Sequence, residues 1–128
     1  MLRQVFGQKV LIIEDDPAVR RTLCTILRVN GYKVVEAEDG RDGVDTFIRE
    51  RCSLVITDLF MPDQDGIETI QRIRVLDSSV PILAISGADE MASSALQDAR
   101  LLGATRTLAK PFDVKELLEA VRELVGLS

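Results

Sequence analysis

Short apolar segments alternate along the chain with longer segments that carry a helical repeat. Four apolar runs are too brief for helices and rich in residues that suit strands: 10–13, 54–57, 82–85 and, more weakly, 105–108. A fifth run, 32–36, has the pattern of a strand nearer an edge of a sheet. Between these runs, apolar residues recur at helical spacing within 19–27, 44–48, 67–73, 91–102 and 114–125. The pattern therefore predicts five strand–helix units.

The residues that flank the helical segments support this division. Asp16 and Pro17 supply a helix N-cap and a proline at the first helical position. Gly31 and Gly103 follow two of the segments, at the position where glycine commonly ends a helix.

The order of the elements predicts an α/β fold. Strands that are apolar on both faces and joined by helix-length connections form a parallel sheet covered by helices on each side. We therefore expect a doubly wound, five-stranded parallel sheet, (βα)5, in a single domain over residues 1–128, with a core from about 9 to 125. In such sheets the ligand site lies beyond the carboxyl ends of the strands.

Composition narrows the choice of function. The net charge of −5 and the pI near 4.8 oppose direct binding to nucleic acid, which needs a basic patch. The absence of histidine removes the usual general base and the commonest zinc ligand. No run approaches the roughly 18 apolar residues of a membrane span, and no secretory signal is apparent, so we expect the cytoplasm. Cys24 and Cys52 are expected to be buried, reduced thiols.

Five polar residues follow the predicted strands: Glu14, Asp15, Asp58, Ser86 and Lys110. Each alone has an ordinary explanation as a loop, turn or surface residue. Together they would place three carboxylates, a hydroxyl and an ammonium on one rim. Carboxylates about 4 Å apart repel by roughly 4 kcal/mol at an effective dielectric near 20, which a divalent cation would relieve. Oxygen ligands of this kind favour Mg²⁺.

This set of residues predicts phosphoryl transfer to a carboxylate. Asp15 and Asp58 would ligate Mg²⁺ directly and Glu14 through water, with a backbone carbonyl close after Asp58, that of Phe60, completing the protein ligands. An in-line carboxylate is a competent nucleophile toward phosphorus. Lys110 and the cation would neutralise the phosphoryl oxygens, and the Ser86 hydroxyl would hydrogen-bond one of them.

The same residues carry a resemblance to a known family. The segments 10–17, with Glu14-Asp15-Asp16-Pro17, and 58–66, which begins Asp58-Leu59-Phe60-Met61-Pro62, resemble the response-regulator receiver domains of two-component signalling, as do Ser86-Gly87 and Lys110-Pro111-Phe112. The match extends from about residue 9 to 125.

Membership of that family implies a flavodoxin-like strand order, 2-1-3-4-5, like that of a chemotaxis receiver. It also implies that Asp58 is the phosphoacceptor, that Glu14 and Asp15 form a Mg²⁺ pocket, that Ser86 is the switch hydroxyl and that Lys110 binds phosphate. A cis peptide bond between Lys110 and Pro111 is expected on the same ground. The implied partners are a sensor histidine kinase or phosphotransfer protein and an output domain or partner protein. A homodimer is compatible with the family, but the chain selects no arrangement.

Three positions distinguish this chain within that pattern. Thr107 stands where receivers usually carry an aromatic residue that moves on activation, so we expect an atypical output surface. Phe60 and Ala88 offer no polar group to orient an attacking water, which predicts a slowly hydrolysed phosphoryl group. The alternative is that these two side chains only pack.

Other functions are less well supported by the sequence. An aspartyl phosphatase would need an Asp-x-Asp motif after the first strand, and a nucleotide hydrolase would need a Gly-x-x-x-x-Gly-Lys loop; neither is present. The main alternative is a receiver-like docking module that works without phosphorylation. Because the full set of acidic, hydroxyl and lysine residues is present, we favour the phosphorylated switch.

Overall fold

The structure is a computed structural model that describes residues 8–59, 66–87, 97–100 and 102–125. Its main elements, in chain order, are β1 (Lys9–Ile13), α2 (Pro17–Val29), β2 (Lys33–Ala37), α3 (Gly40–Arg49), β3 (Leu54–Asp58), α4 (Gly66–Leu76), β4 (Ile82–Ser86), β5 (Arg106–Ala109) and α6 (Val114–Val125). Residues 97–100 and 102 are also helical and lie between β4 and β5. The first part of the helical segment predicted over 91–102 falls outside the described residues.

The five strands form one parallel sheet in the order β2-β1-β3-β4-β5, as the family resemblance implied. β1, β3 and β4 lie in the interior and β2 and β5 at the edges. The two edge strands begin and end one residue later than the apolar runs predicted, at 33–37 and 106–109. Tyr32, expected to begin a strand, is instead buried in the core beside it.

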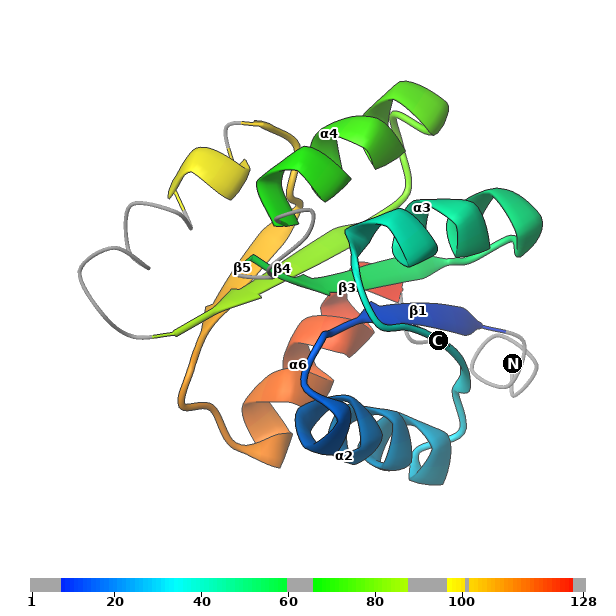
Figure 1. Cartoon of the computed structure of the whole chain (residues 1–128). Helices are drawn as coiled ribbons and strands as arrows, with labels where there is room; N and C mark the ends of the chain where they lie inside the picture. The colour runs from blue at the N-terminus through cyan, green and yellow to red at the C-terminus, as the bar shows by residue number, and fades with distance from the viewer. Residues whose placement is uncertain (1–7, 60–65, 88–96, 101, 126–128) are drawn as a thin grey trace.

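Helices cover both faces of the sheet (Figure 1). On one face, α2 and α6 pack against the side chains of Val10 and Ile12 in β1. On the other face, α3 and α4 pack against Leu11 and Ile13. Successive side chains of a strand point to opposite faces, so a strand covered on both sides must be apolar throughout. This explains why the interior strands read as uninterrupted hydrophobic runs.

The predicted helix boundaries at α2 are confirmed. The Asp16 carboxylate accepts hydrogen bonds from the backbone N–H groups of Ala18, at 2.9 Å, and Val19, at 3.3 Å, while Pro17 occupies the first position of the helix. Gly31 follows the helix with φ of 95° and Gly103 has φ of 130°, which are backbone conformations that favour glycine. At the start of α2, the Asp16 cap and Pro17 together fix the direction in which the chain leaves β1.

The two cysteines are both free thiols, as expected. Cys24 is buried between α2 and the sheet, and burial raises the pKa of its thiol to about 11. Cys52 is only half-buried, so the prediction of full burial is wrong for that residue. Cys52 lies in the short segment between α3 and β3, and partial burial still raises the pKa of its thiol to about 11.

Gly66, the first residue of α4, packs directly on the backbone at the end of β3. A Cβ atom placed on Gly66 would lie 2.3 Å from the carbonyl oxygen of Asp58 and 2.5 Å from Cα of Leu59. Its N–H also donates to the Leu59 carbonyl at 3.0 Å. Because backbone atoms cannot rotate out of the way as a side chain can, only glycine fits here without moving the end of β3.

We expect Gly66→Ala to destabilise the fold by about 2 to 4 kcal/mol, since the added methyl must displace the backbone of β3. Urea unfolding followed by circular dichroism measures this change. Gly87→Ala is the matched control, because a Cβ there meets no atom of the described residues within 4 Å, and we expect it to change stability by less than about 1 kcal/mol. Equal effects of the two substitutions would contradict the packing argument.

Candidate functional site

The structure brings the five predicted residues to the carboxyl edge of the sheet. Two of them, Glu14 and Asp15, directly follow β1, and Asp58 is the last residue of β3. Ser86 is the last residue of β4, and Lys110 directly follows β5. The pairing register places Asp58 beside Ile85, so neighbouring strands end at nearly the same level. Residues that are far apart in sequence therefore meet on one rim because their strands are parallel.

Three carboxylates form the centre of this rim. Glu14, Asp15 and Asp58 each offer an oxygen, and these oxygens lie within 4.8 Å of one another. Glu14 is only 3% exposed and Asp58 only 9%, whereas Asp15 is half-buried. Because water screens buried charges poorly, the ionised forms of these side chains repel one another strongly.

The raised pKa of Glu14 shows that the ionised form of this buried carboxyl group is unfavourable. Burial, together with a smaller contribution from the charge of Asp58, raises the pKa of its carboxyl group to about 7 from an ordinary value near 4.5. The backbone N–H of Asp16 donates to Glu14 Oε2 at 3.1 Å, and this bond acts in the opposite direction by stabilising the ionised form. The negative charge on the rim is thus only partly compensated by the protein.

Lys110 supplies the cation of the site. Its Nζ atom lies 3.4 Å from Asp58 Oδ2 and 3.7 Å from Glu14 Oε1, so one ammonium serves both buried carboxylates. The peptide bond between Lys110 and Pro111 is cis, as the family resemblance implied. The Lys110 N–H donates to the Ser86 carbonyl at 2.6 Å, which ties the loop after β5 to the end of β4.

Ser86 places a buried hydroxyl at the end of β4. The residue is fully buried, and within the part of the chain that the structure describes its Oγ is a buried side-chain oxygen with no hydrogen bond. A buried polar group in this condition costs free energy and calls for an explanation. Beside it, a Cβ placed on Gly87 would meet none of the described residues within 4 Å. A hydroxyl held ready for an incoming ligand fits both observations.

The residues of the rim fit a hard divalent cation. All three candidate ligands are carboxylates, which suit Mg²⁺ better than a softer transition metal. Two of these carboxylates are buried, and their repulsion would be relieved by a positive ion. The predicted fourth ligand, the backbone carbonyl of Phe60, lies outside the described residues, as does Ala88.

Sequence reasoning missed two contacts that hold the acidic residues in place. Arg20 Nη1 donates to the backbone carbonyl of Glu14 at 2.7 Å. Thr57 Oγ1 donates to the backbone carbonyl of Asp58 at 3.0 Å. Both are side-chain bonds to backbone atoms, which leave no periodic pattern in a sequence. The position of Arg20 one helical turn after Asp16 was the available signal.

Thr107 lies in β5, paired with Ala84 of β4, and its side chain is half-buried. The strand therefore carries a small polar residue at the position where the family usually has an aromatic ring. The expected effect of this substitution on the output surface stays a prediction.

The fold and the rim together define a receiver domain, and comparison with known proteins agrees. The family model for the response regulator receiver domain matches residues 10–122. This chain therefore belongs to the receiver domains of two-component response regulators, which are phosphoacceptor signalling proteins.

Two curated relatives show the range of proteins that carry such a domain. Sporulation initiation phosphotransferase F of Bacillus subtilis (strain 168) is 31% identical over 123 residues, which cover 96% of this chain and 98% of that protein. Response regulator MprA of Mycolicibacterium vanbaalenii is 37% identical over 118 residues, which cover 91% of this chain. The matched region is only 50% of that relative, so the chain spans about half the length of several relatives it matches.

Solved structures match the fold closely. The receiver domain of a sensor histidine kinase from Pseudomonas aeruginosa PAO1, which has a magnesium ion coordinated in its active site cleft, superposes with a TM-score of 0.84 at 28% identity. That match covers 94% of this chain and 98% of the other. A Vibrio cholerae chemotaxis protein gives a TM-score of 0.83 at 28% identity, covering 91% of this chain and 98% of that one. Among the described helices, none is long and apolar enough to cross a membrane.

We expect Glu14→Gln to raise the free energy of unfolding of the metal-free protein by about 1 to 2 kcal/mol, because it removes a buried charge that Asp58 repels. Chemical unfolding in the presence of EDTA at pH 8 measures the change. Glu38→Gln is the matched control, since Glu38 is exposed just after β2, and it should have little effect. A loss of stability in Glu14→Gln would show that the acidic cluster is not under electrostatic strain.

Proposed function

We propose that the chain is a phosphorylation switch in which Asp58 accepts a phosphoryl group from a phosphohistidine on a sensor histidine kinase or phosphotransfer protein. Glu14, Asp15 and Asp58 would hold the Mg²⁺ that this reaction requires. The observation that carries the proposal is the rim itself: three carboxylate oxygens within 4.8 Å, with an ammonium 3.4 Å from one of them. The Mg²⁺ of the related Pseudomonas structure supports the choice of ion.

The proposed reaction moves one phosphoryl group between two nucleophiles. A carboxylate oxygen of Asp58 forms the new P–O bond while the P–N bond to the donor imidazole breaks and its electron pair returns to the ring nitrogen. Lys110 lies close enough to Asp58 to balance negative charge on the transferred group. The bound Mg²⁺ would supply further charge neutralisation on the phosphoryl oxygens.

Ser86 would connect phosphorylation to the rest of the fold. Its hydroxyl has no hydrogen-bond partner among the described residues, and it could donate to a phosphoryl oxygen on Asp58, which would satisfy the buried group. The Ser86 carbonyl already accepts from Lys110 N–H, so movement of one residue shifts the other. Because Thr107 replaces the usual aromatic residue, we propose that the change reaches an output domain or partner through this backbone link.

The setting of the domain is part of the proposal. A single domain that works in the cytoplasm, without direct contact to nucleic acid or membrane, fits the expectation from composition. MprA is a response regulator about twice as long as the match, so a longer regulator with an output domain is one possible setting. The phosphotransferase is almost fully matched by this chain, so a short phosphotransfer protein is the other. Either a longer regulator or a short phosphotransfer protein would use the same site, and a homodimer is compatible with both.

We expect incubation with acetyl phosphate and Mg²⁺ to add about 80 Da to the intact mass of the protein, because one phosphoryl group is attached. Omission of Mg²⁺ and the substitution Asp58→Asn should each abolish the gain. Asp45→Asn, on the exposed surface of α3, is the matched control and should keep it. A wild-type protein that gains no mass would favour the alternative, a docking module that works without phosphorylation.

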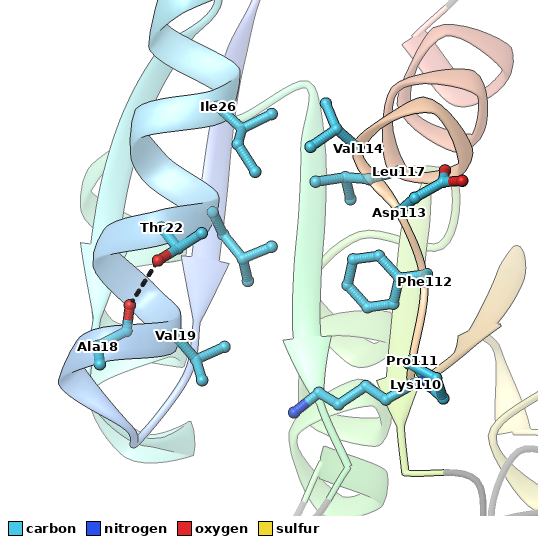
Figure 2. A pocket seen from close by; sticks show the side chains of 11 residues that line it. Ala18, Val19, Thr22, Ile26, Lys110, Pro111, Phe112, Asp113, Val114 and Leu117 are labelled. Carbon is cyan, nitrogen blue, oxygen red and sulfur yellow. Dashed lines mark hydrogen bonds between the residues drawn. The ribbon is translucent and has the colours of Figure 1, made fainter.

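An apolar groove beside the rim offers a docking surface for the phosphodonor. It has a volume of about 680 Å³ and runs between α2 and the segment from Lys110 to the start of α6. Figure 2 shows Val19 and Ile26 of α2 facing Phe112 and Val114 across it, with the ammonium of Lys110 near one end. We propose that a helix carrying the phosphohistidine lies here, because continuity with Lys110 brings the phosphoryl group to Asp58.

We expect Val114→Glu to slow transfer from a histidine kinase that phosphorylates the wild type by about tenfold, because a charge would enter an apolar contact. Val114 is 49% exposed, so the fold should tolerate the change. Radiolabel transfer from the kinase measures the rate, and the acetyl phosphate reaction should be unaffected. Val75→Glu, at an 87% exposed position on α4, is the control. Equal slowing by both variants would argue against docking in the groove.

A further inference from the structure

Arg20 joins the end of β1 to the edge strand β2. The residue lies one turn into α2, where its N–H donates to the Asp16 carbonyl at 2.9 Å. Its guanidinium reaches back toward the sheet: Nη1 donates to the Glu14 carbonyl at 2.7 Å, and Nε lies 3.4 Å from Glu36 Oε1. The side chain is only 19% exposed. A single, largely buried cation is therefore fixed to two different strands.

The contact with Glu14 fixes both acidic residues that follow β1. The carbonyl held by Arg20 belongs to the peptide group that joins Glu14 to Asp15, and this group is planar. On its other side, the Glu14 N–H donates to the Ala37 carbonyl at 3.1 Å. The backbone from which both carboxylates project is thus held at two points. An arginine bond to this carbonyl limits rotation of the peptide plane and hence the separation of the two side chains.

We propose that Arg20 is a positioning residue that presets the Glu14 and Asp15 carboxylates for a divalent cation. The inference rests on the proposed metal role of the rim. In it, Arg20 does not ligate the ion but restrains the backbone of two residues that would. Arg20 acts through the backbone of Glu14 and through Glu36. Residues that orient metal ligands from outside commonly govern metal affinity.

Arg28 provides a matched control on the same helix. Its Nη2 donates to Glu36 Oε2 at 3.3 Å and to the Val34 carbonyl at 3.2 Å, so it shares the acidic partner of Arg20. Both of these bonds run to β2 and neither involves Glu14. Replacing Arg28 removes the same charge and an ion pair with Glu36, but leaves the peptide group of Glu14 held. Any difference between the two variants therefore reports the contact with Glu14.

The test is calorimetric titration of metal-free protein with MgCl₂ for the wild type, Arg20→Met and Arg28→Met. We expect Arg20→Met to weaken Mg²⁺ binding about tenfold, and Arg28→Met to stay within about twofold of the wild type. Equal affinities for the two variants would overturn the positioning role. If Arg20→Met does not fold, Arg20→Lys replaces it, because a lysine keeps the charge but cannot make both contacts. That variant should also bind more weakly than Arg28→Lys.

A second readout separates this inference from the proposed metal role. In metal-free protein, we expect the Glu14 amide to exchange with solvent faster in Arg20→Met than in Arg28→Met, since only the former frees the peptide group that follows Glu14, which lets the hydrogen bond from the Glu14 N–H to the Ala37 carbonyl open more often. A wild type that binds no Mg²⁺ would overturn the proposed metal role. Unchanged exchange at Glu14 in Arg20→Met would overturn the positioning role, whatever the metal result.

Discussion

Repulsion between buried carboxylates is the constraint on which the rest of this structure depends. Parallel strands end at the same edge of the sheet, so the acidic residues after β1 and at the end of β3 lie close together. Their oxygens lie within 4.8 Å, and burial raises the pKa of Glu14 to about 7. One lysine, 3.4 Å from Asp58, offsets only part of this charge. The remaining negative charge fits a divalent cation, as we propose for Mg²⁺.

Burial of apolar side chains in the two hydrophobic layers offsets the unfavourable free energy of this site. β1, β3 and β4 are buried along nearly their whole length, with helices packed on each face. Burial of apolar surface is the main favourable contribution to folding, and it tolerates a few poorly satisfied groups at a functional edge. Ser86 illustrates the point, because its fully buried hydroxyl lies at the end of the most apolar part of the sheet. The packed faces of the sheet therefore supply the stability, and the polar side chains lie at its carboxyl edge.

The sequence predicted much of the fold because periodicity and strand ends are local properties. The uninterrupted apolar runs indicate the interior strands, and the rule that ligand sites lie at the carboxyl ends of parallel strands predicts that Asp58 and Lys110 share one rim. The edge strands were each misplaced by one residue, since β2 is covered less completely and its alternation is weaker. Tyr32 looked like a strand residue because aromatic side chains suit both strands and cores.

Contacts between side chains and distant backbone were beyond sequence reasoning. Gly66 touches the backbone of Asp58, and Arg20 holds the carbonyl of Glu14, yet neither contact follows from hydrophobic pattern or charge. Such contacts depend on the exact path of two loops, which is set by the packed structure as a whole. The motif residues indicate the chemistry, and the contacts of Gly66 and Arg20 hold the backbone at the ends of β3 and β1 from which those residues project.

Hydrogen bonds that continue beyond the strand ends link the parts of the rim. Leu59 N–H donates to the Ile85 carbonyl at 3.0 Å, and Lys110 N–H donates to the Ser86 carbonyl at 2.6 Å. The first residues after β3 and β5 are therefore both bonded to the end of β4. Under the proposed function, a displacement of the end of β4 toward a group on Asp58 would pull on both neighbours through these directional bonds. With Thr107 in place of an aromatic ring, this pair of backbone bonds is the route by which we propose that the chain transmits its signal.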